Sequence, residues 1–435
     1  MPSNYFQHRC ARLWAMALSL CAICGADSAL SAQISSRPEA VPFLLDQQVQ
    51  RSNYNIRLGP VMLDLIGTFG IEYDDNVNTS ENNELEDIIL QPGLSFGAKW
   101  QFSEFNELSL SVGAEYWKYL KNSELDENSK SFSVSPDTEL SFRVVIGEVV
   151  VRVYDRLQYD ISSTDSIGYT VSGGTATVNE QDPGLFPRFT NTLGAQSEWY
   201  IDKTRFGAQV SRKDVWSTES VYDYINRVDY DFLLNADRQL ASNFTLGLGF
   251  EYQDINYSED INNDGKIYRF GPYVDWGVTE VISVRAGVAL ENAEFDNNSV
   301  ITASSDDDSY TGLSGSVRVR HLLNEAFNHA LEGYRRVSTA DTSNFYIVDG
   351  LRHTSALQIF PRVRLDTLLS YEMSESSGGF LDDDFNRFEA GLSFNLVLGP
   401  RLTADVGYRY EDKDSDAAFR SYQRNRARIL FQYDF

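Results

Sequence analysis

The sequence is poor in the residues on which many enzyme and metal sites depend. Its 435 residues include 3 cysteines, and none follows Cys24, so the rest of the chain can form no disulfide and no thiol site. There are 4 histidines, and His321, His329 and His353 show no metal-ligand spacing such as H-E-x-x-H. We therefore expect that the protein is not an enzyme and binds no cofactor. A barrel enzyme, the alternative, would need catalytic residues that come together only in the folded structure.

Long apolar runs and excess positive charge are also missing. After the first 32 residues no segment approaches 18 consecutive apolar residues, which excludes a membrane-spanning helix. Asp and Glu number 63 against 37 Lys and Arg, and the net charge of -26 argues against nucleic acid as a partner. Methionine is scarce, with 4 residues, whereas 24 Tyr and 26 Phe favour β-strands.

The first 32 residues differ from the rest of the chain. A weakly basic start precedes the apolar stretch LWAMALSLCAIC, and the small residues ALSA follow it. This pattern predicts a secretory signal peptide over 1–32, followed by a short periplasmic segment over 33–60.

Apolar and polar residues alternate with period two along most of the remaining chain, which is the pattern of half-buried strands. In RNRARILFQYDF, for example, Ile429, Phe431, Tyr433 and Phe435 share one face. The alternation predicts about 18 strands, within a range of 16–18, over 61–73, 86–101, 107–119, 130–146, 148–159, 187–202, 203–216, 224–239, 243–256, 266–279, 281–294, 309–322, 327–339, 347–359, 361–373, 385–398, 401–412 and 422–435.

The connections between these strands alternate between long acidic loops and tight turns such as DKT and GPR. Five of the 6 tryptophans lie near predicted strand ends, where membrane barrels carry aromatic girdles. Lipid offers no hydrogen-bond partner to the backbone, so only a closed sheet or a helix can span it. We predict an all-β, antiparallel up-and-down transmembrane barrel over 61–435 in the bacterial outer membrane, with both termini periplasmic. A β-propeller or a long sandwich would need turn periodicities that are not seen here.

The segment from 67 to 100 contains EYDDNV, then Asp87-Ile88, then PGLSF. It resembles the opening hairpin of the β-barrel porin type 2 family. The resemblance implies an outer-membrane barrel, often associated with exopolysaccharide production, and implies no catalytic residues.

Arginines dominate the predicted inward faces of the last third of the chain. A ladder of guanidinium groups could guide an anionic solute or an acidic polysaccharide, because arginine binds carboxylate and phosphate with a planar fork. The alternative, which the sequence favours, is that they pair across the lumen with acids such as Asp366, Glu389 and Asp405. The pore-lining candidates are Arg318, Arg320, Arg336, Arg352, Arg362, Arg364, Arg387, Arg409, Arg424, Arg426 and Arg428.

Two loop features suggest cation binding, each with a simpler explanation. Asp260, Asn262 and Asp264 match the first half of a calcium loop, but the twelfth position is Gly271, and Asp-Gly turn chemistry explains the same residues. Acidic clusters in other loops could bridge through divalent cations to lipopolysaccharide, although the sequence favours the explanation that they are solvated loops.

The sequence therefore predicts an outer-membrane porin or pore for passive passage of solutes, or for export of an anionic exopolysaccharide. The alternative is a non-conducting structural or adhesive barrel with acidic surface loops. Loop 160–186 is the predicted constriction. Phe431, Tyr433 and Phe435 resemble the C-terminal signal read by the barrel assembly machinery, and we expect the last strand to pair with the first. Expected partners are outer-membrane lipid and lipopolysaccharide.

Overall fold

A computed structural model describes residues 56–126, 131–163, 169–172, 175–178, 185–297, 306–340, 343–379 and 382–435, with side chains outside 161–186. The predicted signal peptide over 1–32 and most of the segment 33–60 lie outside this range. No helix in the described part is long and apolar enough to span a membrane.

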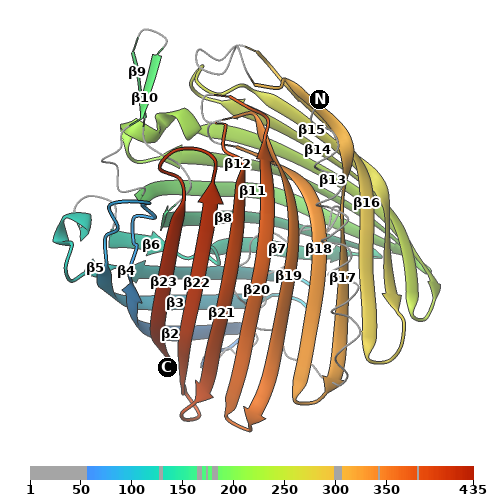
Figure 1. The fold of residues 1–435 in the computed structure, drawn as a ribbon. Coiled ribbons are helices and arrows are strands. Elements are labelled where there is room, and N and C mark those ends of the chain that lie inside the picture. The colour runs from blue at the N-terminus through green and yellow to red at the C-terminus, as the bar shows by residue number, and fades with distance from the viewer. Residues whose placement is uncertain are drawn as a thin grey trace.

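The described strands form one antiparallel sheet that closes into a barrel (Figure 1). Of its 21 strands, β1, β5 and β6 are short additions, and the other eighteen form the wall. The wall strands are β2 (Val61–Asp74), β3 (Asp87–Gln101), β4 (Glu107–Tyr116), β7 (Glu139–Ile146), β8 (Val149–Ser163), β11 (Leu185–Ile201), β12 (Thr204–Ser217), β13 (Arg227–Ala241), β14 (Phe244–Tyr257), β15 (Gly265–Gly277), β16 (Ile282–Phe295), β17 (Ser309–Asn324), β18 (Phe327–Thr339), β19 (Phe345–Phe360), β20 (Val363–Ser376), β21 (Phe385–Val397), β22 (Leu402–Ser415) and β23 (Tyr422–Asp434).

The barrel closes where the last strand meets the first. β23 pairs with β2 from Ile66↔Asp434 to Asp74↔Arg426, and Phe435 N donates to Leu65 O at 3.0 Å. Figure 1 shows the blue β2 beside the dark red β23. The predicted pairing of first and last strand is thereby confirmed, and it leaves no open sheet edge at this seam.

The outward side of the wall is apolar, as the period-two pattern predicts. Leu290 on β16 is 64% exposed and lies opposite Leu313 on β17, which is 56% exposed. Exposed tryptophans Trp100, Trp199 and Trp276 lie near the short turns. A closed sheet with an apolar outer band and aromatic girdles is the architecture of bacterial outer-membrane barrels.

The two ends of the barrel differ. We name them the turn end, where tight turns join the strands, and the loop end, where the long connections lie. At the loop end the 3-10 helices η1 (Ser123–Asp126) and η3 (Ser220–Ile225) pack in buried apolar clusters. The fully buried Asp383 there accepts from Lys413 Nζ and Arg420 Nη1, each at 3.1 Å. The long connections are therefore ordered against one another.

The strand predictions differ from the structure in a few places. The predicted strand 130–146 is divided into β6 (Phe132–Val134) and β7, with Pro136 between them, because proline has no N–H for the ladder. The predicted strand 107–119 is likewise divided, into β4 and β5 (Lys118–Tyr119), at Trp117, whose N–H donates to Ser131 O. β1 (Ile56–Leu58) pairs with β2 within the expected N-terminal segment. In the loop 160–186, β9 (Tyr169–Ser172) and β10 (Thr175–Val178) pair as a hairpin, and the predicted inward fold of its side chains lies outside the described residues.

Candidate functional site

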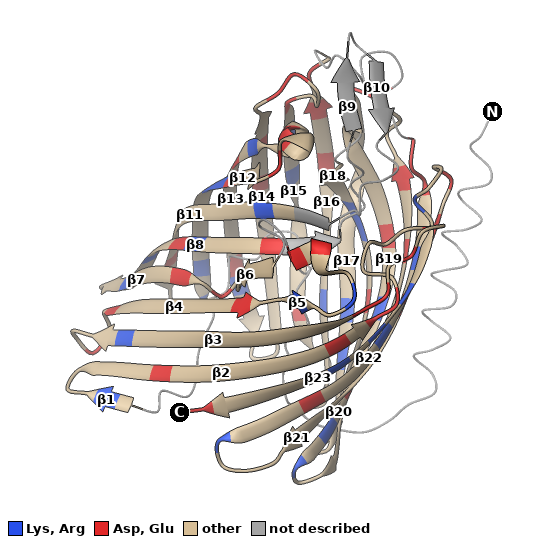
Figure 2. Ribbon diagram, turned by 90° about the vertical axis from the view of Figure 1, so that its left-hand side faces the viewer, with Lys and Arg blue, Asp and Glu red and all other residues tan. Residues whose placement is uncertain are grey.

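The inner face of the wall carries most of the charge that the strands contain. Period two places every second side chain in the lumen, and these positions alternate with the lipid-facing ones. Figure 2 shows basic and acidic residues spread over the wall strands. Because charges on the lipid side would be costly, the lumen is the surface where this chain can contact a polar solute.

All but one of the predicted pore-lining arginines lie on the lumen face of a strand. Arg362 is the exception: it is exposed in the turn between β19 and β20. The others lie on the inward positions of β17 to β23, namely Arg318, Arg320, Arg336, Arg352, Arg364, Arg387, Arg409, Arg424, Arg426 and Arg428. Their role as a pore lining remains a prediction.

Several of these arginines contact acids closely. Arg424 binds Asp74 across the β2–β23 seam through Nε at 2.9 Å and Nη2 at 2.5 Å. Arg364 Nη2 lies 2.8 Å from Asp366 Oδ2, and Arg409 pairs with Glu389. The alternative role, in which ion pairs with acids stiffen the barrel wall, thus fits these three arginines.

Other predicted arginines pair more loosely. Arg336 Nη2 lies 3.8 Å from Glu372 Oε1, and Arg387 Nη1 lies 4.0 Å from Glu372 Oε2. Arg426 Nη2 lies 3.9 Å from Glu411 Oε2. These separations exceed the range of N–H···O hydrogen bonds, about 2.7–3.2 Å. For Arg336 and Arg426 these acids offset the charge at distances too long for a hydrogen bond.

Some arginines have no ion pair within the described part of the chain. Arg320, Arg352 and Arg428 are in this class, and the buried Nε of Arg428 has no hydrogen-bond partner there. Arg320 lies near the turn end and is exposed. The exposed guanidinium of Arg320 is therefore available for a solute, whereas the Nε of Arg428 is buried.

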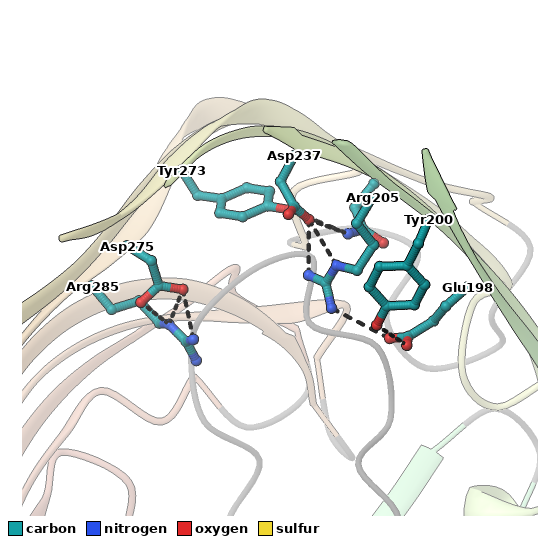
Figure 3. Close-up of polar contacts among 8 residues, drawn as sticks. Glu198, Tyr200, Arg205, Asp237, Tyr273, Asp275 and Arg285 are labelled. Carbon is teal, nitrogen blue, oxygen red and sulfur yellow. Dashed lines mark hydrogen bonds and ion pairs between the residues drawn. The ribbon is translucent and has the colours of Figure 1, made fainter. Parts of the chain in front are cut away.

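The sequence prediction missed a second charged network, on β11 to β16 near the turn end (Figure 3). Arg205 Nη2 lies 2.8 Å from Asp237 Oδ2, which also accepts from Tyr273 Oη at 2.9 Å. On the neighbouring strands, Arg285 Nη2 lies 2.6 Å from Asp275 Oδ2. The period-two pattern already placed these residues on inward faces, so the signal was present, but only the more arginine-rich C-terminal strands were singled out.

The weak calcium candidates take part in contacts between loops. Asn262 Nδ2 donates to Tyr224 O at 2.9 Å, and Asp264 Oδ1 accepts from Tyr257 N at 2.7 Å. Within the described ranges, no group of three or more His, Cys, Asp or Glu is arranged to hold a metal ion. Asp264 thus binds within its own turn, Asn262 joins two loops, and calcium binding by these residues stays a prediction.

The three histidines considered above come together on the outward face of β17 to β19. His329 Nε2 lies 3.3 Å from His321 Nδ1, and the rings of His329 and His353 lie 5.5 Å apart. Their spacing in sequence gave no sign of this, because the contact depends on the strand register.

The residues of the predicted assembly signal lie together at the turn end of β23. Phe431, Tyr433 and Phe435 are all exposed on the outward face, and the rings of Tyr433 and Phe435 meet edge to face at 5.1 Å. Recognition by assembly machinery stays a prediction.

Comparison with known proteins finds similar barrels among solved structures. Pseudomonas aeruginosa OpdL is 9% identical, with 87% of this chain and 99% of that chain covered and a TM-score of 0.48. Acinetobacter baumannii OccAB3 is 12% identical, with 87% and 100% covered and a TM-score of 0.49. Pseudomonas aeruginosa OprD is 11% identical, with 93% and 99% covered and a TM-score of 0.47. Likeness at this level carries no argument about function.

No family model and no curated protein matches the chain. The resemblance of residues 67–100 to the β-barrel porin type 2 family therefore stays a prediction.

Proposed function

We propose that this outer-membrane barrel is a porin for passive passage of small anionic solutes. A closed barrel of eighteen strands is wide enough for an aqueous lumen. The observation that carries the proposal is the set of loosely paired or unpaired arginines on one side of that lumen, on β17 to β23.

The two sides of the lumen differ in how their arginines are paired. On β7 to β16 short ion pairs predominate, as in Arg152–Glu139 at 2.5 Å and Arg269–Glu291 at 2.6 Å, and Arg188, which lies 3.9 Å from Asp160, is an exception. On β18 to β23, Arg336 and Arg426 lie 3.8 and 3.9 Å from their acids. A passing carboxylate or phosphate can accept hydrogen bonds from such guanidinium groups without breaking a short ion pair.

The acidic loops do not oppose this proposal strongly, because several of their carboxylates already have partners. Asp383 is held by Lys413 and Arg420, and Glu86 Oε1 lies 2.5 Å from Lys121 Nζ. Fields of exposed charges are also screened over about 8 Å at physiological ionic strength. The arginines act on a solute at contact distance, where screening is weak.

Planar-bilayer recordings of the purified barrel test the proposal through the reversal potential in a salt gradient. We expect anion preference in the natural chain and a fall of about twofold in the anion-to-cation permeability ratio for Arg320→Gln or Arg428→Gln, the size of one partly exposed charge contact. Arg212→Gln is the matched control, because Arg212 lies on the outward face and pairs with Asp214 at 2.6 Å.

Two outcomes would contradict the proposal. A folded barrel that never conducts would favour the non-conducting structural or adhesive barrel. Conductance with identical selectivity in all variants would leave the arginines a structural role only. Export of an anionic exopolysaccharide, which the family resemblance implied, gains no support from the described residues and remains a separate prediction.

A further inference from the structure

The pairing between β17 and β18 ends earlier than the strands do. β17 pairs with β16 as far as Ser309, and β18 pairs with β19 as far as Thr339. Between β17 and β18, however, the described pairs stop at Gly315↔Arg335. The part of the β18–β19 hairpin beyond this pair, which we name the inner hairpin (336–340 and 343–348), is therefore not paired with β17. It stays paired with β20 through residues 346–348, and its Phe345 ring lies 5.8 Å from the Tyr310 ring of β17.

The inner hairpin packs against the inside of the wall. Val337 and Phe345 are 4% and 3% exposed, and they share a buried cluster with Ile255, Ile267 and Phe295 of β14, β15 and β16. The rings of Phe345 and Phe295 stack at 5.7 Å. Ile255, Ile267 and Phe295 occupy lumen-facing positions, so the hairpin lies within the barrel and narrows the lumen at the loop end.

Polar contacts secure this position across the strands that intervene in the sheet. Arg269 on β15 donates from Nη2 to Val337 O at 3.0 Å, while its Nε and Nη1 bind Glu291 and Glu251, each at 2.6 Å. Nearer the tip, Asn263 Nδ2 donates to Asn344 Oδ1 at 2.9 Å. Arg269 thus joins two wall carboxylates to the hairpin backbone.

The opposite face of the inner hairpin is directed toward the remaining lumen. Arg336 lies on this face, because the adjacent Val337 faces the wall. Its side chain is 24% exposed, its guanidinium lies 5.4 Å from the ring of Tyr334, and Glu372 is 3.8 Å away. A solute that passes the narrowed section comes close to this arginine.

From these contacts we infer that the inner hairpin is the constriction of the pore, that Arg336 sets its preference for anions, and that Arg269 is a positioning residue for the hairpin. The inference rests on the proposed function and goes beyond it, because it assigns selectivity to one residue and one element. It also assigns the constriction to a segment other than loop 160–186.

The first experiment compares two adjacent arginines on opposite faces of β18. Arg336→Gln should lower the anion-to-cation permeability ratio by about twofold or more, as expected for a charge contact in a narrowed section. Arg335→Gln is the matched control, because Arg335 points outward and pairs with Asp349 at 2.9 Å. Equal selectivity of the two variants would overturn the role of Arg336 and leave the proposed function intact.

The second experiment tests the position of the hairpin without relying on selectivity. No cysteine follows Cys24, so Asn263→Cys with Asn344→Cys introduces a single possible disulfide into the rest of the chain. We expect it to form in outer membranes, as seen by mass spectrometry of the intact protein. Failure of the pair to crosslink in the folded barrel would overturn the inner hairpin itself.

Arg269→Gln then tests the positioning role. We expect larger and noisier conductance in this variant, and we expect the oxidised 263–344 disulfide to restore conductance close to the natural value until a reductant is added. Conductance equal to that of the natural chain in Arg269→Gln would overturn this role. A natural chain that never conducts would overturn both the proposed function and the constriction.

Discussion

At the scale of single residues, three loop carboxylates are held in an unfavourable state at neutral pH. Burial raises the pKa of Asp264, Asp306 and Asp384 above the ordinary value of 3.8, and nearby acids add to the effect. Asp306 accepts from Ser377 Oγ at 2.6 Å and from Asn344 N at 2.8 Å, which only partly offsets its burial. These residues join the long connections at the loop end.

Because the pKa values of these three carboxylates are raised, we predict that the loop end is more stable in mild acid than at neutral pH. As the pH falls from 7 through the raised values toward 3.8, the folded chain binds protons that the unfolded chain does not yet bind, so the free energy of unfolding rises. Asp306→Asn should flatten this dependence, measured as the pH dependence of the unfolding temperature. Glu81→Gln, at an exposed loop position, should leave it unchanged. A natural chain with equal unfolding temperatures at pH 7 and pH 5 would contradict this account.

At the scale of elements, the last strand has two separable roles. Its outward residues belong to the apolar outer band and close the seam, whereas Arg424, Arg426 and Arg428 face the lumen. The ring of Phe435 lies over Gly67 of the first strand, where an added Cβ would be 3.1 Å from its Cε2. The seam therefore depends on Phe435, whereas the lining of the lumen does not.

Deletion of Phe435 should impair folding rather than transport. We expect a smaller heat-modifiable fraction in the outer membrane, because the N–H to Leu65 O bond and the ring contact are lost, while the folded molecules conduct as the natural chain does. Gel migration of boiled and unboiled samples measures the folded fraction. Phe419→Ala, an exposed loop aromatic, is the control. A normal yield of folded protein with altered conductance would show instead that Phe435 serves transport and not folding.

At the scale of the whole molecule, the lumen is an electrostatic surface enclosed by an apolar one. If the arginines select solutes by charge, anion preference should weaken as salt rises from about 0.1 M to about 1 M, because the Debye length falls from about 10 Å to about 3 Å. Reversal potentials at a fixed concentration ratio measure this. A preference independent of salt would indicate selection by size.

The sequence predicted the fold well because a membrane barrel is specified by local features. The alternation of apolar and polar residues identified strands such as β14 and β23. The alternation of tight turns with long loops indicated the order of the strands. The division at Pro136 was visible in principle, since proline interrupts a ladder. The arginine faces followed from the same period, with Arg362 misplaced because a turn boundary shifted by one or two residues.

The amino-acid sequence already specifies the closed sheet, its two faces and the side on which charge lies, because each depends on the spacing of neighbouring residues. The folded chain was needed to show which arginine meets which acid, that the three histidines meet, and that the hairpin of Val337 and Phe345 folds inside the wall. These contacts join residues far apart in the chain. They depend on strand register and on where the β17–β18 ladder ends, and the spacing of neighbouring residues determines neither.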